Sequence, residues 1–277
     1  MLGIILVIFG TSLDEVASSI GKWNVNHKIE CLYTMGFLNY FWAAIFFLLL
    51  IIIKGQFIFS LSSLPLFLLL EVLNVAQVYS SLHAIAEADR STFGFLMVGT
   101  IPLLLLVDTF LGYPISLSAL IGISFIVMSL LFLFINHGLS KKGIGYVWFS
   151  TFNAVIAISI YKHLITYYNS VEAQTFVELT ILLIIFYILA VWKSKENPLR
   201  FVFNKKFLLQ SLSRGFAVVL INFAYLYAPA SIITGAKRGT SVLASIVSGN
   251  KYFHEKHVVI KLISFAFVIA GLILLFR

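Results

Sequence analysis

Polar side chains recur at helical spacing inside an otherwise apolar stretch. Glu71, Asn74, Gln77 and Ser81 follow one another at intervals of three, three and four, so Glu71, Asn74 and Ser81 share one stripe of a helix with Gln77 beside it. A carboxylate followed by amides suits the binding of an amine or a proton. The alternative is hydrogen bonding between helices, worth about 0.6 kcal/mol per contact. Glu71 is the strongest single candidate for a functional carboxylate.

A second stripe near the end of the chain consists of small polar residues behind a cation. Lys237, Ser241, Ser245 and Ser248 are spaced by four, four and three positions. Such a stripe could line a cavity and bind an anionic group. Close helix packing by small residues, with Lys237 reaching the lipid headgroups, explains the same pattern. Arg238 points elsewhere on the helix, and we expect it to be a headgroup anchor.

Two acids are adjacent in the first apolar stretch. Asp14 shares a helical stripe with Thr11 and Ser18, whereas Glu15 shares one with Lys22. A charge at membrane depth costs about 2.5–3.5 kcal/mol on insertion scales and therefore marks a candidate functional site. We expect one of the two acids to face the interior of the helix bundle.

Isolated polar residues complete the set of candidates. Asn153, Asn222 and Tyr225 each interrupt an apolar stretch and could orient a bound solute or bond one helix to another. Asp108 and Glu178 are weaker candidates, because both lie near the ends of their stretches and within reach of an interface.

Motifs for catalysis or for nucleotide binding do not occur. Gly21-Lys22 is followed by Trp23 and not by the Ser or Thr of a phosphate-binding loop, and His254 and His257 are spaced by three rather than by the four of a zinc-protease helix. All histidines fall in expected loops or at expected helix ends, so no acid–base pair is predicted inside the bundle. We expect no catalytic residue, no metal and no cofactor.

Composition places these residues in a membrane. Hydrophobic residues make up 61% of the 277 and charged residues only 11%, whereas a soluble domain carries roughly a quarter of charged residues. The formal charge of +8 is spread over short loops, where basic residues orient membrane helices, so we expect no nucleic-acid partner. The single cysteine excludes an internal disulfide.

Apolar stretches of about 20 residues, the length that crosses a bilayer as a helix, recur along the whole chain. They predict an all-α membrane protein with ten transmembrane helices, located in a cell membrane of the bacterial inner-membrane kind. The predicted spans are 2–21, 32–53, 64–83, 91–110, 116–136, 144–163, 173–192, 206–227, 232–249 and 258–276.

The spans divide into two sets of five, at 1–140 and 141–277. Phe110 and Phe253 each precede a turn and a long apolar stretch, which favours an internal duplication, although few letters are shared. Five helices in each repeat bring the second repeat into the membrane from the opposite side. The result is a pair of inverted repeats, an architecture typical of secondary transporters with a site near the bilayer midplane.

The segment from Ala236 to Lys256, AKRGTSVLASIVSGNKYFHEK, followed by an apolar stretch that contains Gly271, resembles the drug/metabolite transporter superfamily, EamA-type. The matching features are a Lys/Arg-Thr-Ser start, a glycine, an aromatic residue and a Glu-Lys pair. The first repeat departs from the pattern, with Gly112-Tyr113 where Gly-Glu is often found. The resemblance implies transport of amino acids, metabolites, nucleotide sugars or drugs.

We therefore expect a secondary transporter that moves a small molecule by alternating access, with a proton as the candidate coupling ion and a homodimer as the candidate assembly. The candidate binding residues are Glu71, Asn74, Asp14, Asn153, Asn222, Tyr225, Lys237 and Ser241. The alternative is a non-transporting subunit that assembles with another membrane protein. A channel is disfavoured by the absence of a filter sequence or charged rings.

Charge and resemblance disagree on orientation. Loops on the side opposite the termini hold most of the lysines, and the positive-inside rule places those loops in the cytoplasm. The resemblance implies the reverse, with both termini cytoplasmic. Cys31, expected at the mouth of the second span, offers a direct test with an impermeant thiol reagent.

Overall fold

The computed structural model describes residues 2–110, 117–136, 139, 141–228 and 230–275, and these form eleven α-helices without a strand. The helices are α1 (Leu2–Asn26), α2 (Leu32–Lys54), α3 (Leu64–Glu87), α4 (Arg90–Met97), α5 (Thr100–Phe110), α6 (Leu117–Ile135), α7 (Ile144–Tyr167), α8 (Val171–Lys193), α9 (Lys205–Tyr227), α10 (Ala230–Phe253) and α11 (Val258–Leu275). Gly112-Tyr113, where the first repeat departs from the family pattern, lies outside the described residues.

These helices follow the predicted spans, with one division. The predicted span 91–110 is split between α4 and α5 at Val98-Gly99. Pro102 accounts for the split, because a proline nitrogen has no hydrogen to donate to the carbonyl of Val98, four positions earlier. Hydrogen bonds that span three residues, from Val98 N to Phe95 O and from Gly99 N to Leu96 O, form a tighter turn there instead.

Local capping fixes several helix ends. The side chains of Cys31 and Ser170 accept hydrogen bonds from the first turns of α2 and α8, and Asn204 does the same for α9. Gly55 ends α2 in the left-handed conformation, with φ of 61°. These caps satisfy free backbone groups at the starts of α2, α8 and α9 and at the end of α2.

Length and apolar character identify a helical membrane protein. Seven segments of the described chain are long and apolar enough to cross a membrane: α1, α2, α3 with its preceding turn, α4 with α5, α7, α8 and α9. Long helix α10 is not among them, because its small polar residues lower its hydropathy. Many large apolar side chains are exposed on the outer surface, as expected for contact with lipid.

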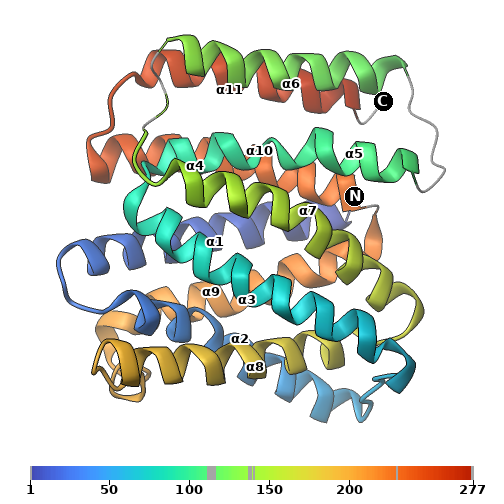
Figure 1. Cartoon of the computed structure of the whole chain (residues 1–277), viewed down its shortest axis with the longest axis vertical. Helices are drawn as coiled ribbons and strands as arrows, with labels where there is room; N and C mark the ends of the chain where they lie inside the picture. Colours follow the sequence, from blue (N-terminus) through green and yellow to red (C-terminus); the bar gives the residue numbers. More distant parts are fainter. Residues whose placement is uncertain (1, 111–116, 137–138, 140, 229, 276–277) are drawn as a thin grey trace.

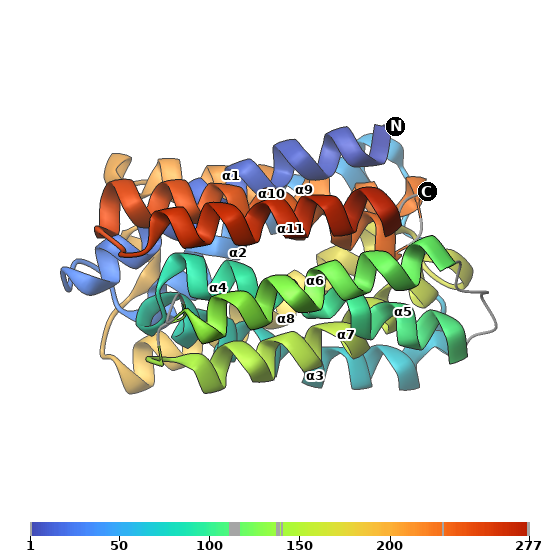
Figure 2. The same ribbon diagram turned by 90° about the horizontal axis from the view of Figure 1, so that it is seen from above.

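The helices run side by side along one direction (Figure 1). Helices α6 and α11 pack together at one edge, and α2 and α8 pack together at the opposite edge. Between these edges α1 packs on α9 and α10, while α3 packs on α7 and α10 packs on α4. The turned view shows that both termini lie at the same end of the bundle (Figure 2).

Candidate functional site

A polar cavity of about 260 Å³ lies within the bundle. It is surrounded by eight helices, α1 to α4 and α7 to α10. Its polar lining consists of Thr11, Asp14, Glu15, Ser18, Tyr40, Asn74, Gln77, Ser81, Tyr161, Glu178, Arg214, Asn222, Tyr225, Lys237, Arg238 and Ser241. Both signs of charge are therefore enclosed at membrane depth, where an uncompensated charge is costly.

Two larger hollows, of about 780 and 540 Å³, have mostly apolar linings. One lies between α3 and α7, and the other lies between α1 and α10. Their rims include exposed apolar side chains such as Val72 and Val16. The smaller central cavity is the better candidate for a solute site, because convergent polar groups define such sites more than volume does.

Most of the residues singled out in the sequence meet in this cavity. Six candidates line it and come from four different helices: Asp14, Asn74, Asn222, Tyr225, Lys237 and Ser241. Glu71 and Asn153 are absent from the lining. Asn153 instead donates to the carbonyl of Leu73 at 2.9 Å and to Gln77 Oε1 at 2.9 Å, which bonds α7 to α3.

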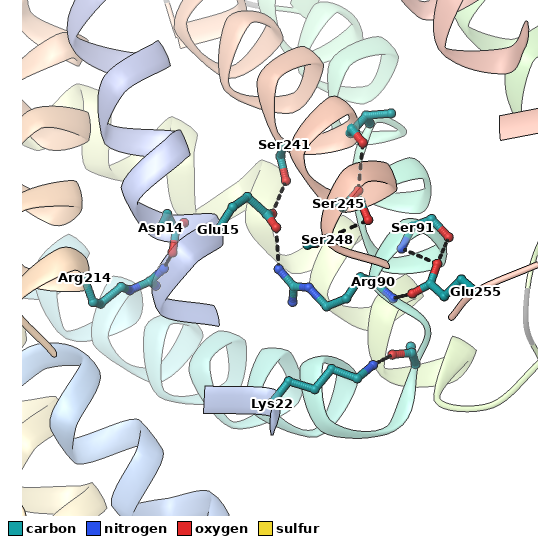
Figure 3. Close-up of polar contacts among 12 residues, drawn as sticks. Asp14, Glu15, Lys22, Arg90, Ser91, Arg214, Ser241, Ser245, Ser248 and Glu255 are labelled. Carbon is teal, nitrogen blue, oxygen red and sulfur yellow. Dashed lines mark hydrogen bonds and ion pairs between the residues drawn. The ribbon is translucent and has the colours of Figure 1, made fainter. Parts of the chain in front are cut away.

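Asp14 forms an ion pair with Arg214, which joins α1 to α9 (Figure 3). The two side chains are 17% and 21% exposed, so the pair remains open to the cavity. Arg214 also donates to the Tyr40 hydroxyl at 3.4 Å and stacks over its ring. Arg214 was not singled out in the sequence, because its partner lies 200 residues away.

Glu15 is held from two sides. Arg90 Nη2 donates to Glu15 Oε2 at 2.6 Å, and Ser241 Oγ donates to Oε1 at 2.8 Å (Figure 3). Arg90 is only 1% exposed. Glu15 shares a helical stripe with Lys22 but does not pair with it, because Lys22 Nζ donates instead to the carbonyl of Ala88. Glu15 thus connects α1 to α4 and α10.

The helix ends near Lys22 are joined by a second carboxylate. Glu255, in the loop after α10, accepts from the backbone nitrogens of Arg90 and Ser91 and from the Ser91 hydroxyl (Figure 3). Lys261 Nζ lies 3.0 Å from Glu255 Oε2. Burial alone would raise the pKa of Glu255, but the Ser91 hydrogen bond and the Lys261 charge outweigh it and lower the pKa. These contacts join the start of α4 to the loop after α10 and to α11.

The opposite end of the cavity is lined by aromatic side chains. Tyr161 and Tyr225 pack edge to face with ring centroids 6.1 Å apart. Their hydroxyls bond Thr175 and Thr234 at 3.0 and 3.1 Å. A buried apolar cluster from α1, α2, α3, α7, α8, α9 and α10 surrounds this end, where Lys162 Nζ also donates to the carbonyl of Tyr225.

Two cations of α10 line the cavity without a carboxylate partner in the described part of the chain. Lys237 forms no ion pair there, and Arg238 Nε donates only to Thr100 Oγ1 at 3.2 Å. The anchor role expected for Arg238 is wrong, because its side chain is buried and faces inward. Both residues lie about two turns into α10, too deep for a headgroup anchor.

The location predicted for Glu178 is also wrong. It was expected within reach of an interface, yet it is buried, lines the cavity and accepts from Gln174 Nε2 at 2.6 Å. Glu71 lies behind the lining, where Asn74 Nδ2 approaches its Oε1 at 3.5 Å. The side chain of Asp108 lies outside the described residues. Among those residues, no group of three His, Cys, Asp or Glu side chains could hold a metal ion.

A scan of the chain against protein-family models and a search of curated proteins find no match. The site's chemistry therefore has to be argued from its own residues.

Proposed function

We propose that this chain is a secondary transporter that carries a small solute through the central cavity. The observation that carries the proposal is the polar cavity within the bundle, in which charges of both signs from several helices converge. A purely structural helix bundle would gain nothing from placing lysine and arginine without carboxylate partners at this depth.

The proposed mechanism is alternating access between two inverted repeats, 1–140 and 141–277. Helix packing supports it: α1 packs on α9 as α7 packs on α3, while α2 packs on α8, α4 on α10 and α6 on α11. When each of the first five spans is exchanged with the equivalent span of the second repeat, the same set of packed pairs is obtained. On this basis, and on the segment from Ala236 to Lys256, we propose membership of the drug/metabolite transporter superfamily.

The two ends of the cavity are the proposed gates. Contacts of Glu15 and Glu255 with the start of α4 would close one gate, and the Tyr161–Tyr225 contact would close the other. Opening one gate at a time exposes the cavity to one face of the membrane. Glycines let the moving helices approach closely: a Cβ at Gly94 would come within 2.4 Å of Ser245 Oγ.

The lining also suggests how a solute is held. Lys237 and Arg238 would attract an anionic group, while the amides of Asn74 and Asn222 would orient its polar remainder. A cavity of about 260 Å³ limits the solute to a small metabolite. Glu71 stands behind these residues and would act through Asn74 rather than by direct contact.

A thermal-shift screen of the purified protein tests the proposal. The panel contains amino acids, small organic anions, nucleosides, sugars, polyamines and cationic drugs. A ligand at about 100 times its Kd adds about 2.7 kcal/mol of stability. We expect an anionic or zwitterionic hit that is lost in Lys237→Gln and retained in Lys205→Gln, a matched change at an exposed position.

The absence of any hit with a well-folded sample would contradict the proposal. It would favour the second reading, a subunit without a soluble ligand, and the next step would be a search for a co-purifying membrane partner.

A further inference from the structure

Two buried carboxyl groups of the helix bundle have no cation beside them. Glu71 and Glu178 are 5% and 8% exposed, and neither forms an ion pair with any described residue. Four other buried or half-buried acids do have one, in the pairs Asp14–Arg214, Glu15–Arg90, Glu172–Lys54 and Glu255–Lys261. Glu30 is also buried without an ion pair, but it lies between α1 and α2. Among the described acids inside the predicted spans, Glu71 and Glu178 are the two that have no ion pair.

Glu71 on α3 and Glu178 on α8 lie near one another. Their chain neighbours Leu70 and Leu179 belong to the same buried apolar cluster. The two carboxyl groups repel each other when both are ionised. The titratable group that faces them from α7 is the Tyr161 phenol, which is neutral at physiological pH. The cavity cations Arg214, Lys237 and Arg238 make no ion pair with either acid.

A chain of hydrogen bonds fixes which oxygen of Glu178 is an acceptor. The backbone N–H of Ser60 donates to Asn169 Oδ1 at 2.8 Å, so Asn169 must present its NH₂ to Gln174 Oε1, at 2.6 Å. Gln174 must then present its own NH₂ to Glu178 Oε1. Because a backbone nitrogen can only donate, this assignment does not depend on a choice of amide orientation.

The remaining oxygens are left for a proton. Asn74 is placed to donate to Glu71 Oε1, while Glu71 Oε2 is buried without a hydrogen-bond partner. Two carboxylates that share a desolvated site cannot both be ionised, and one of them takes up a proton. Protonation of either acid removes the repulsion between the two.

We propose that Glu71 and Glu178 form a carboxyl–carboxylate pair that binds one exchangeable proton and serves as the coupling-proton site of the transporter. Glu178 faces the solute cavity and Glu71 lies behind it, so the pair stands between the solute and the apolar core. The coupling part of this inference rests on the proposed transport function. The proton-binding part does not.

Electrostatics also fixes the direction of coupling. An anionic solute held at Lys237 and Arg238 shares the cavity with Glu178, so its charge favours the protonated pair. Linkage is reciprocal, and the bound proton therefore strengthens binding of the anion by the same factor. Proton and solute then occupy the protein together and cross in the same direction.

Labelling with dicyclohexylcarbodiimide tests the site without a known solute. This apolar reagent adds to protonated carboxyl groups inside membranes. At pH 7 we expect an adduct, detected by mass spectrometry, on the peptide that contains Glu71 or Glu178. Peptide mapping distinguishes it from any adduct at Glu30, which is also buried and has no ion pair. The adduct should be lost in the double variant Glu71→Gln/Glu178→Gln and retained in Glu172→Gln, a buried acid paired with Lys54.

Absence of an adduct in the unaltered protein would overturn the proposal, as would an adduct that persists in the double variant. Peptide mapping of the unaltered protein decides the matter even if the double variant fails to fold. An adduct at this pair in a protein without transport would keep the proton site and reject the transport function, so the two failures are distinguishable.

Discussion

Two pairs of acids in the bundle have opposite surroundings. Asp14 and Glu15 of α1 each form an ion pair with an arginine from another helix. Glu71 of α3 and Glu178 of α8 instead have amide hydrogen-bond donors, and the two acids repel each other electrostatically. An acid with a fixed cation stays ionised and bonds helices together. An acid with only amide neighbours can gain or lose a proton without breaking an ion pair.

The comparison assigns different roles to residues of the same type at similar depth. In the proposed mechanism, the α1 acids hold helices together at one gate of the cavity, and the acids of α3 and α8 bind the coupling proton. The role of a buried acid can therefore be inferred only when its partner is known. Substitutions that alter the acids and their partners separately should reveal the difference.

The largest loss of stability is expected when Glu15 loses its partner Arg90. Arg90→Met leaves Glu15 buried and ionised, and breaking a buried pair from one side costs about 3–5 kcal/mol. Unfolding in detergent, followed by intrinsic fluorescence, measures the loss. The double variant Arg90→Met/Glu15→Gln should recover much of it. Unchanged stability of the single variant would show that the pair does not hold α1 to α4.

A buried acid outside the membrane spans gives the next prediction. Glu30, between α1 and α2, contacts the Asn24 amide, and its Oε2 has no hydrogen-bond partner. Burial raises the pKa of Glu30 from 4.5 to about 8. Between those values the folded chain holds a proton that the unfolded chain has lost, so stability falls as pH rises.

Replacement of Glu30 by Gln should remove that pH dependence. We expect the variant to be more stable than the unaltered protein at pH 8 and to show a flatter stability profile from pH 5 to 8. Thermal unfolding across this range measures the slope. Equal slopes in the two proteins would contradict the assignment of the titration to Glu30.

A smaller effect is expected for the acid pair without a cation. Glu71→Gln replaces a carboxyl group by a neutral amide of the same shape, and no cation loses its partner. We expect a stability change of no more than about 1 kcal/mol, the typical value of a single hydrogen bond. Loss of several kcal/mol, as in Arg90→Met, would show that Glu71 has a structural partner after all.

The last prediction concerns the acid side of the stability profile and the carboxylate Glu255, which is paired with buried Lys261. Its lowered pKa means that its contribution to stability is present above the unfolded value of 4.5 and is lost as pH falls below it. Glu255→Gln should therefore reduce stability at pH 7 and blunt the decline of stability on acidification. A variant with the same acid profile as the unaltered protein would contradict this role.

Sequence alone predicted the helices well, because a bilayer sets their length. Each span from 2–21 to 258–276 matches a helix or, at 91–110, two consecutive helices. The break at Pro102 was missed, since proline is tolerated within membrane helices and its effect depends on neighbours. The inverted repeat stays a prediction that the helix pairing supports.

The cavity was harder to predict, because pairing between distant residues decides it. Helical spacing brought Asn74, Ser81 and Ser241 to the interior. Nothing in the local sequence indicated that Arg90 would contact Glu15 and leave Lys22 to a backbone carbonyl. Arg238 and Glu178 were underrated for the same reason, since the direction of a side chain depends on which neighbouring helix receives it.

The central claim, a polar cavity within the bundle that opens to each face in turn, is tested most directly by cysteine accessibility. In a Cys31→Ser background, Asn222→Cys places a thiol in the cavity lining, and Ser211→Cys places one in the buried interface as a control. A small sulfonated methanethiosulfonate reagent, which does not cross membranes, is applied to sealed right-side-out and inside-out vesicles. The account predicts labelling of Asn222→Cys from both faces and no labelling of Ser211→Cys. Labelling of Asn222→Cys from only one face, or from neither, would contradict alternating access through this cavity.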